Sequence, residues 1–148
     1  MLDKALWQHL IPHRDAMCLL DAVVAWDEAG IHARAGSHRD AANPLRADGR
    51  LHALNLCEYG AQAMAVHGGL LAQCEGRAAA PGLLVSLREV KLHAVRIDGL
   101  AGYLDIHAQC LLAGAEAMQY AFRIEHENIV LAEGRAAVMT SAPAGRYA

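Results

Sequence analysis

The chain is poor in aromatic residues, and it lacks the motifs that would assign a metal site or a hydrolytic nucleophile. Phe, Trp and Tyr make up only 5% of its 148 residues, so we do not expect a binding site that stacks aromatic rings on a planar ligand. The zinc motif HExxH and the nucleophile elbow GxSxG are both absent. Its cysteines, Cys18, Cys57, Cys74 and Cys110, include no CxxC pair. We therefore expect no bound metal, no serine hydrolase and no CxxC redox centre.

The chain also lacks a long apolar run and an excess of charge of either sign. No apolar stretch reaches the roughly 18 to 20 residues that span a membrane, and the N-terminal residues do not have the pattern of a signal peptide. A net charge of -3, with 20% charged residues, gives no basic surface for nucleic acid. We expect a reduced, cytoplasmic protein with one domain over residues 1–148 and a flexible tail at 142–148. Because 55% of the residues are hydrophobic, we also expect contact with another subunit.

Hydrophobic periodicity predicts an α+β fold with one dominant helix. A short amphipathic helix is expected at 2–10, two strands within 17–36, an irregular loop at 37–50 and a long helix at about 51–73. Strands are then expected within 83–97, 103–112, 116–126 and 129–141. The long helix is apolar nearly all round, so other elements must surround it. An antiparallel sheet curled around a central helix does this; it is the hotdog fold, which usually occurs as a dimer.

One carboxylate interrupts the predicted central helix. The stretch "LHALNLCEYGAQAMAVHGG" at 51–69 is nearly all apolar or small, apart from Glu58 in the middle and Gln62 one turn later. Burial favours the protonated form of a carboxyl group. We therefore interpret the apolar helix as a setting in which Glu58 keeps its proton and acts as a general acid. Gln62, at i+4, lies on the same face and can orient the carboxyl group.

Three stretches resemble the β-hydroxyacyl-acyl-carrier-protein dehydratases. "IPHRDAMCLLDAV" at 11–23 is similar to their opening turn and strand, and "EYGAQAMAVHGGL" at 58–70 is similar to their central helix. "PGLLVSLREVKLH" at 81–93 is similar to the strand that follows that helix. Within this family the chain resembles the dehydratase-like hotdog proteins of aryl-polyene biosynthetic clusters, which share Asn43-Pro44, Gly49 and the run from Glu58 to Gln62.

The resemblance implies the loss of water from a 3-hydroxyacyl thioester. Such a reaction needs a base, an acid and hydrogen-bond donors for the thioester oxygen. The resemblance assigns Glu58 as the acid, but the Gly-His-Phe-Pro motif of the family is missing. Pro44 stands 14 residues before Glu58, where the family has its histidine. His38 is the leading base, and His52, which stands where the family's helix begins, is the alternative.

The remaining assignments concern support, partners and rival functions. Gln62 and Asn43 are expected to support the site, and His13 is expected to have a structural role in the Pro-His-Arg turn. Backbone N–H groups at the helix start, or around Leu84, Val85 and Ser86, are the candidates for the thioester oxygen.

No cofactor is expected beyond the phosphopantetheine that the substrate carries on an acyl carrier protein or coenzyme A. The basic residues around the loop contact that group or the carrier protein, or are simply solvated; they are Arg14, Arg39, Arg46 and Arg50. We expect a homodimer or a dimer-based higher oligomer, which another hotdog subunit can join. Two alternatives stay open: a hotdog thioesterase, and a non-catalytic subunit that binds acyl groups or a partner.

Overall fold

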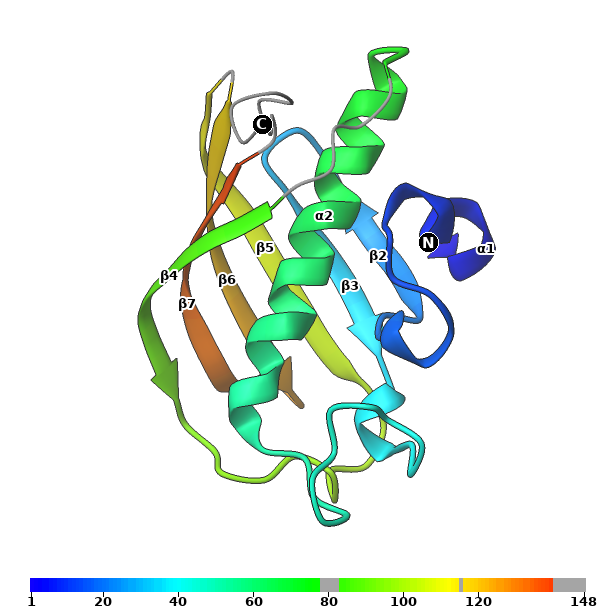
Figure 1. Cartoon of the computed structure of the whole chain (residues 1–148), viewed down its shortest axis with the longest axis vertical. Coiled ribbons are helices and arrows are strands. Elements are labelled where there is room, and N and C mark those ends of the chain that lie inside the picture. Colours follow the sequence, from blue (N-terminus) through cyan, green and yellow to red (C-terminus); the bar gives the residue numbers. More distant parts are fainter. Residues whose placement is uncertain (78–82, 115, 140–148) are drawn as a thin grey trace, which may run out of the picture.

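The computed structural model describes residues 1–77, 83–114 and 116–139 and has the α+β architecture that the sequence predicts (Figure 1). The helices are α1 (Lys4–Trp7) and α2 (Leu56–Cys74), with short 3-10 turns at Gln8–Leu10, Asp15–Met17, Ser37–Arg39 and Ala53–Asn55. The strands are β1 (Leu2–Asp3), β2 (Ala22–Trp26), β3 (Gly30–Ala35), β4 (Leu83–Leu92), β5 (Leu104–Ala113), β6 (Ala117–His126) and β7 (Ile129–Met139). They form one antiparallel sheet in the order β1-β2-β3-β5-β6-β7-β4.

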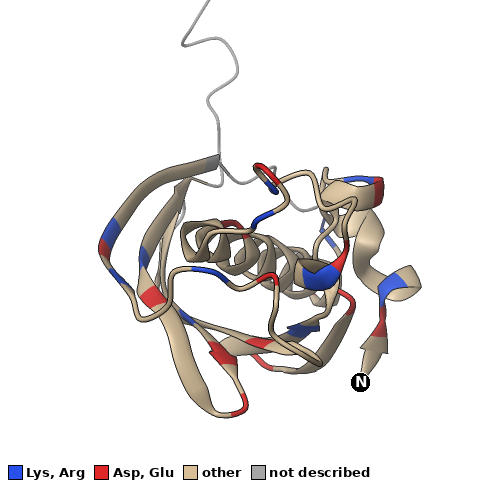
Figure 2. Cartoon of the chain, turned by 90° about the horizontal axis from the view of Figure 1, so that it is seen from below, with Lys and Arg blue, Asp and Glu red and all other residues tan. Residues whose placement is uncertain are grey.

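The sheet curls around α2, which Figure 2 shows end-on. The helix packs against β3, β5, β6 and β7, and most of its residues are buried. This arrangement follows from the composition of α2, because a helix that is apolar nearly all round is stable only when other elements cover it. The predicted hotdog fold is therefore confirmed. No helix among the described residues is long and apolar enough to cross a membrane.

Alternation along the strands decides which side chains face the helix. In β5, Leu104, Ile106 and Ala108 are buried, whereas Asp105 and His107 lie on the outer face. The same period of two holds in β6, where the residues at 120, 122 and 124 are buried. Both patterns follow from the alternation of apolar and polar residues in the sequence of these strands. Figure 2 shows charged residues of both signs interspersed along the sheet.

Two glycines allow α2 to lie very close to its neighbours. A Cβ atom added at Gly60 would be 2.9 Å from the ring of Phe122 on β6. A Cβ atom at Gly69 would be 2.8 Å from the side chain of Leu10, in the N-terminal segment. Gly60 and Gly69 thus allow a strand to pack closely against one side of the helix and the N-terminal segment to pack closely against another.

The structure differs from the sequence prediction at the ends of elements. The helix expected at 2–10 is a two-residue strand, one α-helical turn and a 3-10 turn, because residues 2 and 3 pair with β2. The central helix begins at Leu56 rather than at 51, after a 3-10 turn. The tail predicted at 142–148 lies outside the described residues.

Candidate active site

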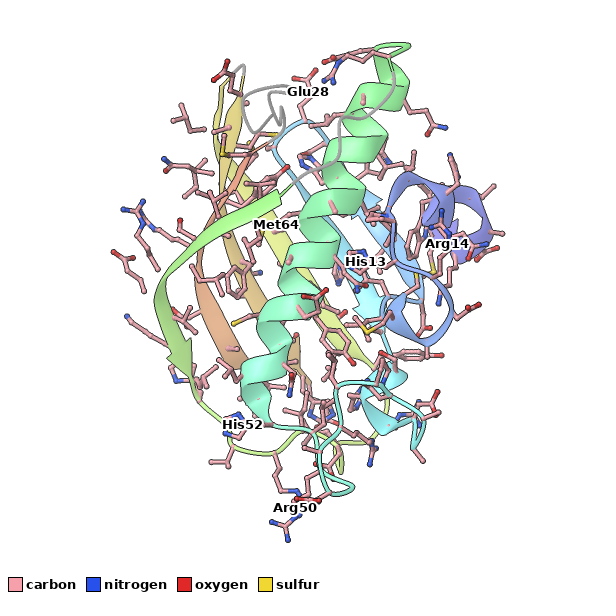
Figure 3. The ribbon with its side chains drawn as sticks, viewed as in Figure 1. His13, Arg14, Glu28, Arg50, His52 and Met64 are labelled. Atoms are coloured by element: carbon pink, nitrogen blue, oxygen red, sulfur yellow. The ribbon has the colours of Figure 1, made fainter. Side chains whose placement is uncertain are left out.

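Glu58 lies in the first turn of α2, beside a histidine from the N-terminal segment. Its Oε1 atom is 3.2 Å from Nε2 of His13, which Figure 3 shows next to the helix. The side chain of Glu58 is 34% exposed and that of His13 is 28% exposed. The expectation of a carboxyl group kept away from water is therefore wrong for the single chain. Glu58 is instead accessible and has an imidazole within ion-pair distance.

Gln62 connects Glu58 to the backbone of the N-terminal segment. The side chain is fully buried, and its carbonyl oxygen accepts a hydrogen bond from the N–H of Leu19 at 2.9 Å. Its Nε2 donates to the carbonyl of Met17 at 2.6 Å and to Oε1 of Glu58 at 3.4 Å. The Leu19 N–H can pair only with an acceptor, so the amide nitrogen must face Glu58. The predicted i+4 contact is present.

Local hydrogen bonds hold the segment that carries His13. Nη1 of Arg14 donates to the carbonyl of Ile11 at 2.6 Å, and Nζ of Lys4 donates to the carbonyl of Cys18 at 2.9 Å. Ile11 and Cys18 are themselves buried. The segment is therefore bound to α2 by packing and to itself by these contacts, and it presents His13 to Glu58.

His38 is not brought to Glu58 within the chain. Its side chain is fully buried, and Nε2 lies 2.8 Å from the carbonyl of Leu100, to which it donates. Burial lowers the pKa of His38, so the ring is neutral near pH 7. His38 is thus packed in the interior beneath the loop that carries it. Its role as the base stays a prediction.

The other predicted polar residues also lie apart from the carboxyl group. His52 is exposed, and its Nδ1 accepts a hydrogen bond from the N–H of Leu54 at 2.9 Å, where it caps a 3-10 turn. Asn43 is buried and donates to the carbonyl of Ser37 at 2.9 Å and to the hydroxyl of Tyr59 at 3.1 Å. Asn43 therefore supports the loop rather than touching Glu58.

Tyr59 is a residue of the site region that the sequence analysis missed. Its hydroxyl is 2.8 Å from Oγ of Ser37, and that Oγ donates to the carbonyl of Leu19 at 2.7 Å. Burial raises the pKa of Tyr59, which keeps the hydroxyl neutral. Since Leu19 also contacts Gln62, one network joins α2, the loop at 37–50 and the N-terminal segment. The signal in the sequence that could have identified Tyr59 was that it is a single Tyr within an otherwise aliphatic helix.

The backbone donors predicted for the thioester oxygen lie on the edge strand β4. Leu84 pairs with Val138 and Ser86 with Ala137, and a bulge between them leaves Val85 outside the ladder. None of the polar contacts of Glu58 in the described part of the chain involves these residues. Leu84 and Val85 are exposed at the open edge of the sheet. Their role as donors stays a prediction.

Two open hollows flank the sheet and the N-terminal segment. The smaller, of about 310 Å³, borders the candidate site and is lined by Gln8, His9, His13, Arg14 and Asp15. The larger, of about 440 Å³, runs across β3 to β4, and it includes neither Glu58 nor His13. Figure 3 shows Arg50 at the lower end of the molecule and Arg14 on its right side, so Arg14 lies apart from Arg50. Among the described residues, no three His, Cys, Asp or Glu side chains are arranged to hold a metal ion.

Comparison with solved structures shows the same fold in other proteins, a dehydratase complex and thioesterases among them. The chain is similar to the dehydratase heterocomplex ApeI:P from Xenorhabdus doucetiae, with 25% identity, a TM-score of 0.82, and coverage of 93% of this chain and 91% of the other. AziG from S. sahachiroi gives 17% identity, a TM-score of 0.56 and coverage of 82% and 90%. A thioesterase from Haemophilus influenzae gives 14% identity, a TM-score of 0.60 and coverage of 94% and 90%. The last two matches show the fold alone.

Sequence comparison supplies the family. No curated protein sequence matches the chain. The profile of the ApeP-like family, described as ApeP dehydratase, matches residues 6–147, which is nearly the whole chain and includes both His13 and Glu58. With the hotdog fold and the carboxylate on its central helix, this match shows that the chain belongs to the ApeP-like dehydratase family.

Proposed function

We propose that the chain dehydrates 3-hydroxyacyl thioesters and that Glu58 is the group that transfers the proton. The observation that carries the proposal is the accessible carboxyl group of Glu58 on the central helix, held by Gln62 and faced by His13. The substrate is carried on the phosphopantetheine of an acyl carrier protein, in aryl-polyene or fatty-acid-like synthesis. Membership of a dehydratase family supports the reaction class.

The reaction removes a proton from C2 and hydroxide from C3, and it yields an enoyl thioester and water. The electron pair of the C2–H bond becomes the double bond, and the pair of the C3–O bond leaves with the hydroxyl group. A carboxylate can accept the C2 proton and then deliver it to that hydroxyl when both leave from one face. In this proposal Glu58 serves as base and then as acid, in place of His38, whose ring donates to the carbonyl of Leu100. Neither an oxidant nor a cofactor is needed for this balance.

The second component of the proposal is a partner subunit at the β4 edge. Leu84, Val85 and Leu87 are between 38% and 48% exposed on this strand, whose outer edge has no neighbour among the described strands. An open apolar edge favours pairing with another sheet. The relative from Xenorhabdus doucetiae is a heterocomplex, which supports a second hotdog chain as the partner, in addition to a copy of this one.

One observation favours a second candidate, a non-catalytic subunit of a dehydratase assembly. Pro44 occupies the position at which the dehydratases carry their histidine, so the base of those enzymes is missing here. In that case the chain would stabilise or complete an active partner.

Hydration of a crotonyl thioester, the reverse reaction, tests these functions. We expect the purified chain to remove the enoyl absorbance, and Glu58→Gln to lower the rate by at least about 100-fold while the thermal melt is retained. Full activity of Glu58→Gln would remove the assignment. Release of free thiol without hydration would indicate a thioesterase. Activity that appears only with a second hotdog chain, and that ignores Glu58→Gln, would indicate the non-catalytic subunit.

A further inference from the structure

We propose that His13 is a positioning residue for Glu58 of the same chain. Its ring holds Oε1, so that Oε2 is the oxygen that exchanges a proton with the substrate. The inference rests on the proposed function, since it assigns the two oxygens of the carboxyl group that carries the chemistry. It makes the site self-contained, with the carboxyl group and both groups that hold it supplied by one chain.

The contacts of Glu58 distinguish its two oxygens. Nε2 of His13 lies 3.2 Å from Oε1, and Nε2 of Gln62 donates to the same atom at 3.4 Å. In the part of the chain that the structure describes, no hydrogen bond reaches Oε2. The Gln62 amide donates to Oε1 and the His13 ring lies within ion-pair distance of the same atom, so negative charge is favoured on Oε1 and an added proton goes to the other oxygen. Oε2 is therefore the reactive oxygen.

The buried side of the His13 ring fixes where its proton lies. Nδ1 is buried and has no hydrogen-bond partner among the described residues. A proton on Nδ1 would leave a buried donor unpaired, which proteins avoid. The neutral ring therefore carries its proton on Nε2, the atom that faces Glu58. In this form Nε2 lies 3.2 Å from the carboxylate with its proton in place and cannot accept the C2 proton, so His13 positions Glu58 and is not the base.

The position of His13 depends on the same residue that contacts the carboxyl group. Gln62 binds the backbone of Met17 and Leu19, and these residues end the segment that carries His13. The Arg14 side chain closes the turn on the other side of His13 by donating to Ile11. Gln62 thus holds both members of the pair, and the His13–Glu58 contact needs no residue from another subunit.

Three variants separate positioning from packing. His13→Leu removes the donor, and His13→Gln keeps an N–H at the place of Nε2. His9→Leu is the matched control, because His9 is exposed and lines the same hollow but has no contact with Glu58.

We expect His13→Leu to lower kcat by about 10- to 100-fold with KM changed less than about twofold, and His13→Gln to restore most of it. His9→Leu should leave both constants unchanged. Equal losses in the Leu and Gln variants, or a loss seen only in KM, would overturn the positioning role.

A measurement without turnover keeps the two proposals distinguishable. Ring ¹⁵N–¹H spectra at neutral pH should show His13 protonated on Nε2, and Glu58→Gln should shift the ring signals of His13 but not those of His9. A ring protonated on Nδ1, or one that ignores Glu58→Gln, overturns the inference. An inactive wild-type chain whose His13 still responds to Glu58→Gln overturns the proposed function and leaves the pairing supported.

Mixed oligomers test the same-chain assignment. When the Glu58→Gln and His13→Leu chains are unfolded together and refolded, no assembled site contains both native side chains if the pair forms within one chain. We therefore expect no gain over the separate variants. If the pair formed between subunits, random mixing into dimers would restore about a quarter of the wild-type activity, and that result would overturn the assignment.

Discussion

Replacing Gln62 with leucine should destabilise the protein although leucine has a similar size and suits an apolar helix. The N–H of Leu19 and the carbonyl of Met17 lose their side-chain partner in a buried region. Each buried polar group left without a partner costs about 1–3 kcal/mol, and leucine recovers part of this by apolar burial. The net loss should be about 2–4 kcal/mol. For a chain of this size that corresponds to a decrease in Tm of about 5–15 °C.

Urea and thermal unfolding followed by circular dichroism at pH 7 measure this effect. Gln73→Leu is the matched control, because Gln73 is exposed near the end of the same helix. Its free energy of unfolding should change by less than about 0.5 kcal/mol. If Gln62→Leu behaves like Gln73→Leu, the hydrogen bonds of Gln62 do not hold the N-terminal segment, and the argument for a fixed His13 loses its basis.

Gly60→Ala should lower the free energy of unfolding by about 1–3 kcal/mol, because the new methyl group would lie 2.9 Å from Phe122. Gly68→Ala has open space around the new methyl group, so it should raise the free energy of unfolding by about 0.5–1 kcal/mol in the same urea titration. Stability should fall as the pH drops below about 6.5, because burial holds the pKa of His38 and His67 lower in the folded chain than in the unfolded one. The slope reaches at most about 1.4 kcal/mol per pH unit for each histidine, and a flat profile in urea titrations between pH 7 and 5 would contradict it. His38→Asn should lower Tm with less than about a tenfold loss of kcat; a larger loss of kcat at an unchanged Tm would make His38 the base after all.

The sequence predicted those parts of the fold that local periodicity encodes. Strict alternation in β5 and β6 placed Leu104, Ile106 and Phe122 on the inner face, where they are buried. The composition of the central helix predicted that other elements surround it, and the predicted strands are the elements available to do so. The i+4 spacing of Glu58 and Gln62 predicted their contact for the same local reason.

The contact between His13 and Glu58 could not be predicted, because it joins segments 45 residues apart through irregular backbone. Within a helix, spacing relates two side chains directly, whereas the turn around His13 has no period to relate it to α2. The anchors of that turn are the backbone atoms of Met17 and Leu19, which leave no trace in side-chain chemistry. The Pro-His-Arg turn was therefore interpreted as structural only.

The loop at 37–50 misled the prediction of the base in the opposite way. Its polar composition suggested an exposed, accessible histidine, yet His38 and Asn43 are the buried residues that hold the loop in place. A loop that lies against a core must satisfy its own backbone groups, and short polar side chains turned inward do this. The partner of His38 is the carbonyl of Leu100, which comes from the connection between β4 and β5. Such a pairing depends on tertiary structure alone.

The exposure of Glu58 changes the physical reason for placing a carboxylate on an apolar helix. Desolvation cannot be the main cause of its reactivity in a chain where a third of the side chain meets solvent. The apolar helix instead supplies a rigid surface, on which Gln62 has one orientation and donates to one oxygen of Glu58, while the other oxygen has no hydrogen bond among the described residues. A group prepared in this way loses little freedom when the substrate arrives, and that lowers the barrier.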